Sequence, residues 1–495
     1  MKESCAFQLR PDVGGCSTII IGKAVSATGR YLLAHSEDDY DCLVEVHKVP
    51  RIRHKAGETL SFPDGSAVVP EVEETYAYQW SEFRGEEGIS FADCFVNEWG
   101  LAVVSNNCNP CKISETEEQR GGLAYALRRL IAERAKSARE AVELAAKLVE
   151  EYGYAACRSY HFVDKDEAWA FQVPVGHNYV ARRIPEDAVY FIPNNFTIHQ
   201  IDFSDTEHKN FYFSADLVDF ARRNGWYVPA NEGDFSDFDF ARAYQKLQDD
   251  GEYDREDNAM RTRNAWPFLL GYQPEEWRPF CVKADKTYTA ADLKALLRYH
   301  YDGTPDDPCA AGHDSPHYHP LPNPICNAMT AESSVIEFGP VPALTVIWRT
   351  VPKACITPFV PWYFGATRVP RGYEWQAPTT AQRTHFAVPA EEMRIDPNKA
   401  IWAFKILHYI TEFDYAGTHE RVHRSADKLE KAWEAEQPQL LACYDLLIKD
   451  HPAEAAELLT SYTETKARQA WEWALDMIRE LGERKIKENN GTLEI

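Results

Sequence analysis

Cys16 is the residue whose type and setting best suit nucleophilic chemistry. It follows Gly14 and Gly15 and leads directly into the β-rich run at residues 18–23. If the bond between Gly15 and Cys16 were cut, Cys16 would carry a free α-amine beside its thiol. Such an amine titrates at about 7.7–8.0 and can take the thiol proton, which leaves a nucleophilic thiolate. The alternative is an ordinary half-buried cysteine at the start of a strand.

A second group of residues has side chains that could bind a metal. His313, His317 and His319 lie near Asp314 and Cys309, and imidazole and thiolate are suitable zinc ligands. The spacing HxxxHxH differs from the helical HExxH signature of zinc enzymes, and prolines interrupt the segment. We therefore interpret the segment as a polar, solvated loop.

The twelve cysteines of the chain raise the question of disulfides. Cys108 and Cys111 form a CxxC pair, but no second pair completes a zinc site, so we interpret both as ordinary thiols in a loop. The scattered spacing in a long chain without a secretory signal favours reduced thiols.

Cys16 must be positioned by the strands that follow it. Residues 18–23 and 30–34 flank a turn cluster at 26–29, which predicts a hairpin. A second hairpin is predicted around the turn at 97–100. Both hairpins lie in the part of the chain that precedes the first helical segment.

Two helices and a further set of strands come next. The first helix is expected over about 123–135. Ser137 and Glu140 predict a capping box for the second helix, which Gly153 ends. Strands are then predicted at 159–163, 168–173, 179–182 and 189–192. This order predicts an α+β fold in which a helical layer covers a mostly antiparallel sheet.

The second half of the chain is less regular until its end. Residues 302–325 read as a long loop rich in Pro, Gly, Asp and His, and a strand pair is expected at 334–338 and 343–349. From Ala400 onward the pattern is nearly all helical, punctuated by Pro438 and Pro452.

Composition excludes several classes of partner. The 495 residues, 44% of them hydrophobic, can bury a large core, and the formal net charge is -24. A surface this negative repels phosphate backbones and anionic membranes, so no nucleic acid or membrane partner is expected. No apolar run reaches the roughly 20 residues of a membrane helix, and residues 1–15 lack the apolar core of a secretory signal. We expect a cytoplasmic protein.

Several motifs in order resemble one known family. They are similar to those of the N-terminal-nucleophile (Ntn) cysteine dipeptidases, including bacterial dipeptidase A and the related secernins. The motifs are CSTIIIGKAVSATGRYLLAHSEDDYD from Cys16 onward, VNEWGLA, SYHFVDKDEAWAFQVPVGHNYVARRIPEDAV, IPNNFTIHQIDF and ACITPFVPWYFGATRVPRGY. The resemblance implies a four-layer αββα fold with a leader at 1–15, a catalytic region at 16–400 with insertions, and a packed helical region at 401–495.

The resemblance also implies roles for residues near Cys16. Asp38 matches the Asp that holds the amine of the nucleophile. His35 stands where the family usually has an Arg, and a histidine keeps a positive charge beside the thiolate only when it is protonated. The leader of 15 residues is longer than the one that close relatives often carry.

Later positions are carried over from the same resemblance. Asn107, ten residues after Asn97, corresponds to an Asn that donates to the oxyanion in the wider superfamily. Asn194 matches a second Asn near the nucleophile, with Asn195 as its competitor. Arg263 is a candidate for a late active-site Arg, with an ordinary surface Arg as the alternative.

Together these observations predict a cysteine dipeptidase that acts on small unblocked peptides and needs no cofactor or metal. Three alternatives stay open: an amidase of acylated small molecules, a secernin-like protein that acts by interaction, and a metallohydrolase that uses the histidine loop. Homo-oligomer formation is also left open.

Overall fold

The structure is a computed structural model. It describes residues 15–39, 42–61, 66–84, 90–108, 110–115, 122–124, 126–246, 248, 255–317, 323–374 and 394–488. Of the leader expected at 1–15, only Gly15 is among them, and His319 of the histidine loop lies outside them.

A sheet of seven strands carries Cys16 at one strand end. Its order is β16-β14-β1-β2-β17-β18-β19, and all its paired strands are antiparallel. The hairpin predicted behind Cys16 is confirmed as β1 and β2. The strands are β1 (Ser17–Ile21), β2 (Leu32–Asp38), β14 (Ala188–Ile192), β16 (Cys281–Lys283), β17 (Thr330–Glu337), β18 (Val346–Thr350) and β19 (Val360–Tyr363).

A second, antiparallel sheet has eight strands in the order β15-β13-β12-β11-β10-β9-β8-β3. The predicted hairpin around 97–100 is confirmed as β9 and β10, and Gly100 of its turn has a φ of 80°. The strands are β3 (Leu43–Val49), β8 (Tyr78–Arg84), β9 (Ser90–Asn97), β10 (Ala102–Asn107), β11 (Arg158–Val163), β12 (Ala168–Val173), β13 (Val180–Arg183) and β15 (Phe211–Phe213). Two small sheets pair β4 (Ile52–Arg53) with β7 (Glu74–Thr75) and β5 (Thr59–Ser61) with β6 (Val68–Pro70).

Alternating side chains of the second sheet serve two different cores. Phe95 and Val103 face a core shared with the helices α1 (Ala126–Arg134) and α2 (Ala138–Tyr152). Their neighbours Val96 and Val104 face the core that contains the apolar residues of β1 and β2. Because successive strand residues point to opposite faces, the second sheet lies between the helix pair and the first sheet.

The two predicted helices are confirmed as α1 and α2, with a difference at the cap. The Ser137 side chain accepts from the Glu140 main-chain N–H, as predicted. The Glu140 carboxylate, however, accepts from the N–H of Lys136, so the expected reciprocal box is shifted by one residue. Gly153 ends α2 with a φ of 74°.

Helices also pack against the first sheet. The helix α5 (Glu256–Leu270) contacts β14, and α6 (Ala290–Leu297) contacts β2 and β17. The short helices α3 (Leu217–Arg223) and α4 (Phe240–Tyr244) lie in the segment between β15 and α5, together with irregular chain. The 3-10 turns are η1 (Lys23–Val25) and η2 (Pro342–Leu344).

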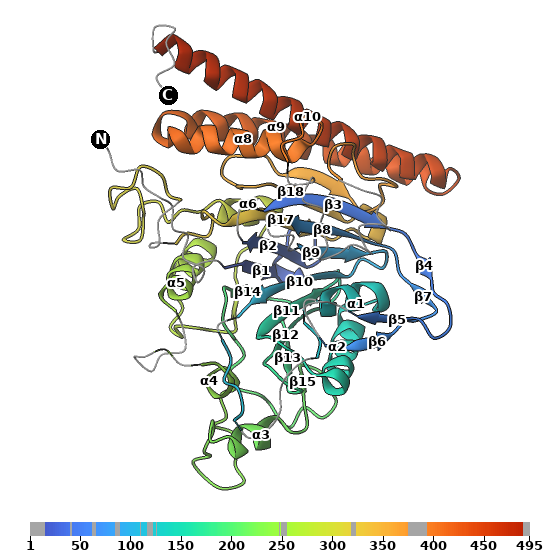
Figure 1. The fold of residues 1–495 in the computed structure, drawn as a ribbon, viewed down its shortest axis with the longest axis vertical. Coiled ribbons are helices and arrows are strands. Elements are labelled where there is room, and N and C mark those ends of the chain that lie inside the picture. Colours follow the sequence, from blue (N-terminus) through green and yellow to red (C-terminus); the bar gives the residue numbers. More distant parts are fainter. Residues whose placement is uncertain are drawn as a thin grey trace.

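The chain ends in three helices that lie side by side, coloured orange to red in Figure 1. They are α8 (Ala400–Phe413), α9 (Tyr415–Leu447) and α10 (Pro452–Glu488), and α10 packs on the edge strand β19. Pro452 opens α10, but Pro438 lies inside α9. The prediction that Pro438 interrupts the helical region is therefore wrong. No helix among the described residues is long and apolar enough to cross a membrane.

Candidate active site

Cys16 is held at the start of β1, a strand with a neighbour on each side. Only 3% of its surface is exposed, and β1 pairs with β14 on one side and with β2 on the other. The five residues of β1 are all buried. The thiol therefore sits on a rigid element rather than on a surface loop.

The pairing of β1 with β2 brings charged side chains to the thiol. Thr18 lies opposite His35, so the residues that follow His35 lie beside Cys16. The Cys16 Sγ, a ring nitrogen of His35 and a carboxylate oxygen of Glu37 all lie within 4.8 Å of one another. The main-chain N–H of Asp38 also hydrogen-bonds the thiol and lowers its pKa.

A chain of hydrogen bonds fixes the protonation of His35. The Asn106 amide donates from Nδ2 to the main-chain oxygen of Pro193 at 3.0 Å, which turns its Oδ1 toward Thr18. The Thr18 hydroxyl donates its only proton to this Oδ1 at 2.6 Å. Its oxygen can then only accept from His35 Nδ1, which lies 2.8 Å away.

The other ring nitrogen of His35 faces two carboxylates. His35 Nε2 lies 3.1 Å from Glu37 Oε2 and 3.5 Å from Asp93 Oδ2. Burial by itself lowers the pKa of His35, but the charges and hydrogen bonds of Asp93 and Glu37 outweigh it and raise that pKa to about 9. His35 is therefore an imidazolium at neutral pH, so the positive charge that the sequence left conditional is present here.

Burial and neighbouring charges give the carboxyl groups of Glu37 and Asp93 different pKa values. Burial, followed by the charge of Asp93, raises the pKa of Glu37 to about 8. Burial also acts to raise the pKa of Asp93, but the charges of Arg128 and His35 overcome it and hold that pKa below its usual value. Arg128 Nη1 lies 2.5 Å from Asp93 Oδ2. Asp93 is thus the fixed anion, and Glu37 can gain or lose a proton near neutral pH.

The two carboxylate oxygens of Asp38 differ in their hydrogen bonds. Its Oδ2 accepts from Asn327 Nδ2 at 2.7 Å, whereas its buried Oδ1 has no hydrogen-bond partner among the described residues. Burial raises the pKa of Asp38 to about 6, against the lowering effects of the Thr330 hydroxyl and the charge of Arg261. A buried oxygen without a donor is costly, and a cation or N–H donor placed beside it would remove that cost.

The thiol of Cys16 is protonated while the leader is attached. Burial, followed by the charges of Glu37 and Asp38, raises its pKa well above the usual value. The thiolate, which is the nucleophilic form, therefore needs a proton acceptor or a new positive charge close to Sγ.

The main chain at Gly15 is enclosed by Asn194 and Arg261. Arg261 Nη1 donates to the main-chain oxygens of Gly15 at 2.9 Å and Cys16 at 2.8 Å. Arg261 Nη2 donates to Asn194 Oδ1 at 2.8 Å. A Cβ on Gly15 would lie 2.0 Å from Asn194 Oδ1 and 2.6 Å from Arg261 Nη2. Only glycine fits at position 15 in this arrangement.

Arg261, and not Arg263, is the arginine that lies at Cys16. The Arg263 guanidinium binds Asp306 and Glu256 instead, and 31% of its side chain is exposed. The structure therefore places Arg263 away from the candidate site, consistent with the alternative of a surface arginine. Helical spacing could have indicated Arg261, because it lies four residues before Ala265 on the buried face of α5.

Of the two asparagines carried over from the resemblance, Asn194 is the one whose side chain contacts Arg261, which binds the main chain of Gly15 and Cys16. Asn107 is exposed at the end of β10, and its main-chain oxygen accepts from Asn194 Nδ2 at 2.6 Å. Its neighbour Asn106, which the sequence did not single out, is the buried one and binds Thr18. Strand alternation separates the two side chains, since adjacent residues point to opposite faces.

The histidine loop also contains both exposed and buried side chains. His313, Asp314 and Cys309 are exposed, as expected for a solvated loop. His317 is 2% exposed, so for this residue the prediction of a solvated loop is wrong. It lies with His300, Cys326 and Cys355 in a buried group whose potential ligand atoms are all within 4.8 Å of one another.

One disulfide contradicts the expectation of reduced thiols. Cys111 is bonded to Cys157, 46 residues away in the sequence. Cys108, the other member of the CxxC pair, is a free, buried cysteine. The sequence did not indicate the pairing because it depends on β10 and β11 lying side by side.

Comparison with known proteins adds a family and several relatives. The model of peptidase family C69 matches residues 15–428. The chain is 24% identical to a probable dipeptidase B of Streptococcus pyogenes serotype M3, over 98% of this chain and 96% of that protein. It is 25% identical to dipeptidase A of Lactobacillus helveticus, over 87% of each.

Among solved structures, penicillin V acylase from Agrobacterium tumefaciens matches with a TM-score of 0.32 and 11% identity, over 70% of this chain and 86% of that one. A mutant of conjugated bile acid hydrolase from Clostridium perfringens matches with a TM-score of 0.29 and 9% identity, over 68% and 89%.

Proposed function

We propose that this chain, which belongs to peptidase family C69, hydrolyses small unblocked dipeptides with Cys16 as its nucleophile once residues 1–15 are removed. The observation that carries the proposal is the setting of the Gly15–Cys16 bond. The carbonyl oxygen of Gly15 accepts a hydrogen bond from Arg261, and the thiol of Cys16 lies beside Glu37 and Asp38. The match to the family begins at residue 15, and the relatives described above are named probable dipeptidase B and dipeptidase A.

Removal of the leader uses the same groups. The Cys16 thiol passes its proton to the Glu37 carboxylate, and the sulfur attacks the Gly15 carbonyl carbon. The guanidinium of Arg261, 2.9 Å from that carbonyl oxygen, stabilises the negative charge that develops there. The C–N bond breaks with transfer of a proton to the Cys16 nitrogen, which forms a thioester. Water then hydrolyses the thioester to a Gly15 carboxylate and a free thiol.

The new α-amine at Cys16 completes the mature site. It supplies the donor that Asp38 Oδ1 lacks, so Asp38 holds it in place. As a base it takes the thiol proton, and as an acid it returns this proton to the leaving amine of the dipeptide. Water then releases the acyl group from Cys16.

The place vacated by Gly15 is the acyl position of the substrate. Once Gly15 has left, one donor of Arg261 is free to bind the carbonyl oxygen of a dipeptide, and Asn194 lies beside it. Asn107 acts by positioning Asn194, since its main-chain oxygen accepts from the Asn194 amide. His35 supplies a fixed positive charge near the thiolate. No cofactor takes part in these steps.

The proposal also covers the fold of the protein and its location in the cell. The two sheets and their helices form a four-layer αββα Ntn-hydrolase fold, supported by the two cores on either side of the second sheet and by the contacts of α5 and α6 with the first sheet. The cytoplasm is the proposed location.

The test combines intact mass with a dipeptide panel. The purified wild-type chain should lack residues 1–15 and cleave dipeptides. Cys16→Ala should keep the leader and lose hydrolysis. Cys443→Ser changes a half-buried cysteine on α9 and should behave like wild type.

A wild-type chain that keeps its first 15 residues and still cleaves dipeptides would overturn the proposal. Hydrolysis of acylated amines but not dipeptides would favour the amidase alternative. A processed chain without any hydrolysis would favour the interaction alternative.

A further inference from the structure

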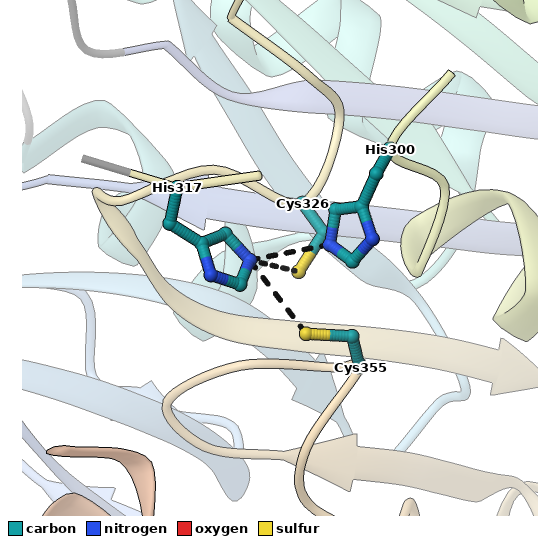
Figure 2. A group of neighbouring side chains, drawn as sticks. All are labelled: His300, His317, Cys326 and Cys355. Atoms are coloured by element: carbon teal, nitrogen blue, oxygen red, sulfur yellow. Dashed lines mark hydrogen bonds between the residues drawn. The ribbon is translucent and has the colours of Figure 1, made fainter. Parts of the chain in front are cut away.

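Four side chains from different segments of the chain meet in the interior (Figure 2). His300 follows α6, His317 lies in the long loop, Cys326 precedes β17 and Cys355 lies between β18 and β19. All four are buried, and none is more than 5% exposed. Two imidazoles and two thiols are a common ligand set for structural zinc.

The distances between the atoms match the edges of a tetrahedron around a metal. The two Nε2 atoms of His300 and His317 lie 3.2 Å apart. His317 Nε2 lies 3.6 Å from Cys355 Sγ and 3.9 Å from Cys326 Sγ. In a tetrahedral site with Zn–N of about 2.0–2.1 Å and Zn–S of about 2.3 Å, these edges are about 3.4 and 3.6 Å.

The four side chains contact one another around one small volume. Figure 2 shows three contacts that converge on Nε2 of His317, and Cys326 also hydrogen-bonds Cys355 and His300. A ring nitrogen carries one proton or one lone pair, so it makes one good hydrogen bond at a time. A central cation interacts favourably with all four atoms at once.

Glu412 and Ser315 orient the ring of His317. Glu412 of α8 places Oε1 2.5 Å from His317 Nδ1, and Ser315 donates to its Oε2 at 2.6 Å. A carboxylate on Nδ1 keeps the proton there and directs the Nε2 lone pair to the centre of the group. This is the usual arrangement behind a histidine that binds zinc.

We propose that His300, His317, Cys326 and Cys355 bind one zinc ion in a structural site. Four protein ligands fill the tetrahedron, so no position is left for a substrate or a catalytic water. Two thiolates balance the charge of the dication. A cavity of about 530 Å³, lined by His300, Cys355 and His423 among others, gives the ion a path from the solvent.

One residue, Asn327, connects the zinc site to the candidate active site. Asn327, which follows Cys326, donates to Asp38 Oδ2 at 2.7 Å. The ion fixes the loop between α6 and β17 at Cys326, and with it the amide that holds Asp38. The role of the metal is therefore to position Asp38, while the chemistry stays at Cys16.

The first experiment measures the metal content of the full chain after purification without chelators. Wild type should hold about one zinc per chain. Cys326→Ser and Cys355→Ser should lose most of it. Cys309→Ser and His313→Ala change exposed residues of the same loop and should keep it. Cys16→Ala should also keep it, which separates this inference from the proposed peptidase activity.

Two measurements cover variants that fail to fold. Glu412→Gln keeps all four ligands and should weaken zinc affinity about 10- to 100-fold. Wild type loaded with Co²⁺ should show thiolate charge-transfer and tetrahedral ligand-field absorption. Wild type that contains no zinc and gives no such spectrum with Co²⁺ would overturn the inference, as would full zinc content in both cysteine variants.

Discussion

At the scale of single residues, hydrogen-bond direction decides the chemistry of the site. Because Asn106 accepts the only proton of Thr18, His35 Nδ1 must donate to Thr18. The charge of the ring depends on its other nitrogen, where Asp93 and Glu37 raise the pKa of His35 to about 9 against the effect of burial. The resemblance noted in the sequence implies an arginine at this position, and a protonated histidine would carry the same charge. Asp93 and Glu37, rather than Thr18, thus keep the positive charge on His35.

Two arginines on one helix offer a matched test of the oxyanion donor. Arg261→Lys keeps the charge but loses the fork that reaches Gly15, Cys16 and Asn194 together. We expect leader removal and dipeptide kcat to fall about 10²- to 10³-fold, as for loss of one oxyanion donor. Arg263→Lys, two residues on, should stay within a few-fold of wild type.

The measurement is the time course of the processed mass together with kcat. A normal rate in Arg261→Lys would show that Arg261 has no part in the reaction, and equal losses in both variants would show that the effect does not come from the contact with Gly15.

At the scale of elements, local patterns predicted the strands and helices better than the site. The β-rich runs and turn cluster behind Cys16 and the caps at Ser137 and Gly153 act within a few residues, so β1, β2 and α2 could be predicted from the sequence. Helical spacing indicates that Arg261 is on the buried face of α5, but its contact with Gly15 depends on how α5 packs on β14, which no local pattern encodes. The zinc ligands span residues 300–355 and come together only in the folded chain.

The disulfide connects the end of β10 to the start of β11. Cys111 and Cys157 close a loop over 46 residues that contains α1 and α2. Breaking it with Cys157→Ser should lower the free energy of unfolding by about 4 kcal/mol, because the unfolded chain regains the freedom of that loop. Denaturant midpoints measure the change, with Cys443→Ser as the control.

The same bond can be checked by counting thiols. An intact chain should show one disulfide by mass after alkylation without a reductant. If both cysteines are alkylated in the native protein, the bond is absent and Cys157→Ser should have little effect.

At the scale of the whole molecule, the buried charges link stability to pH. The folded pKa of His35 is about 9, above the unfolded value of about 6.5. The folded chain therefore holds this proton more tightly, and the contribution of His35 to stability is fully present below about pH 6.5. It is lost as the pH rises through about 9.

The test uses the unprocessed Cys16→Ala chain, with and without His35→Gln. The free energy of unfolding should fall between about pH 6.5 and 9 more steeply with His35 than without it. Parallel curves for the two chains would mean that His35 is not the charged group that the hydrogen bonds indicate. The charge of His35 also lowers the pKa of Glu37 and of Asp93, so the difference between the curves reports His35 together with these two carboxylates.

The contact between Arg261 and the Gly15 carbonyl lies within one chain. Under the proposed mechanism, maturation is a unimolecular event, and its half-life should not change when the protein is diluted. Gly15 would have to leave its contact with Arg261 before a dipeptide carbonyl could take that place. A half-life that shortens as the protein concentration rises would show instead that one molecule cuts another.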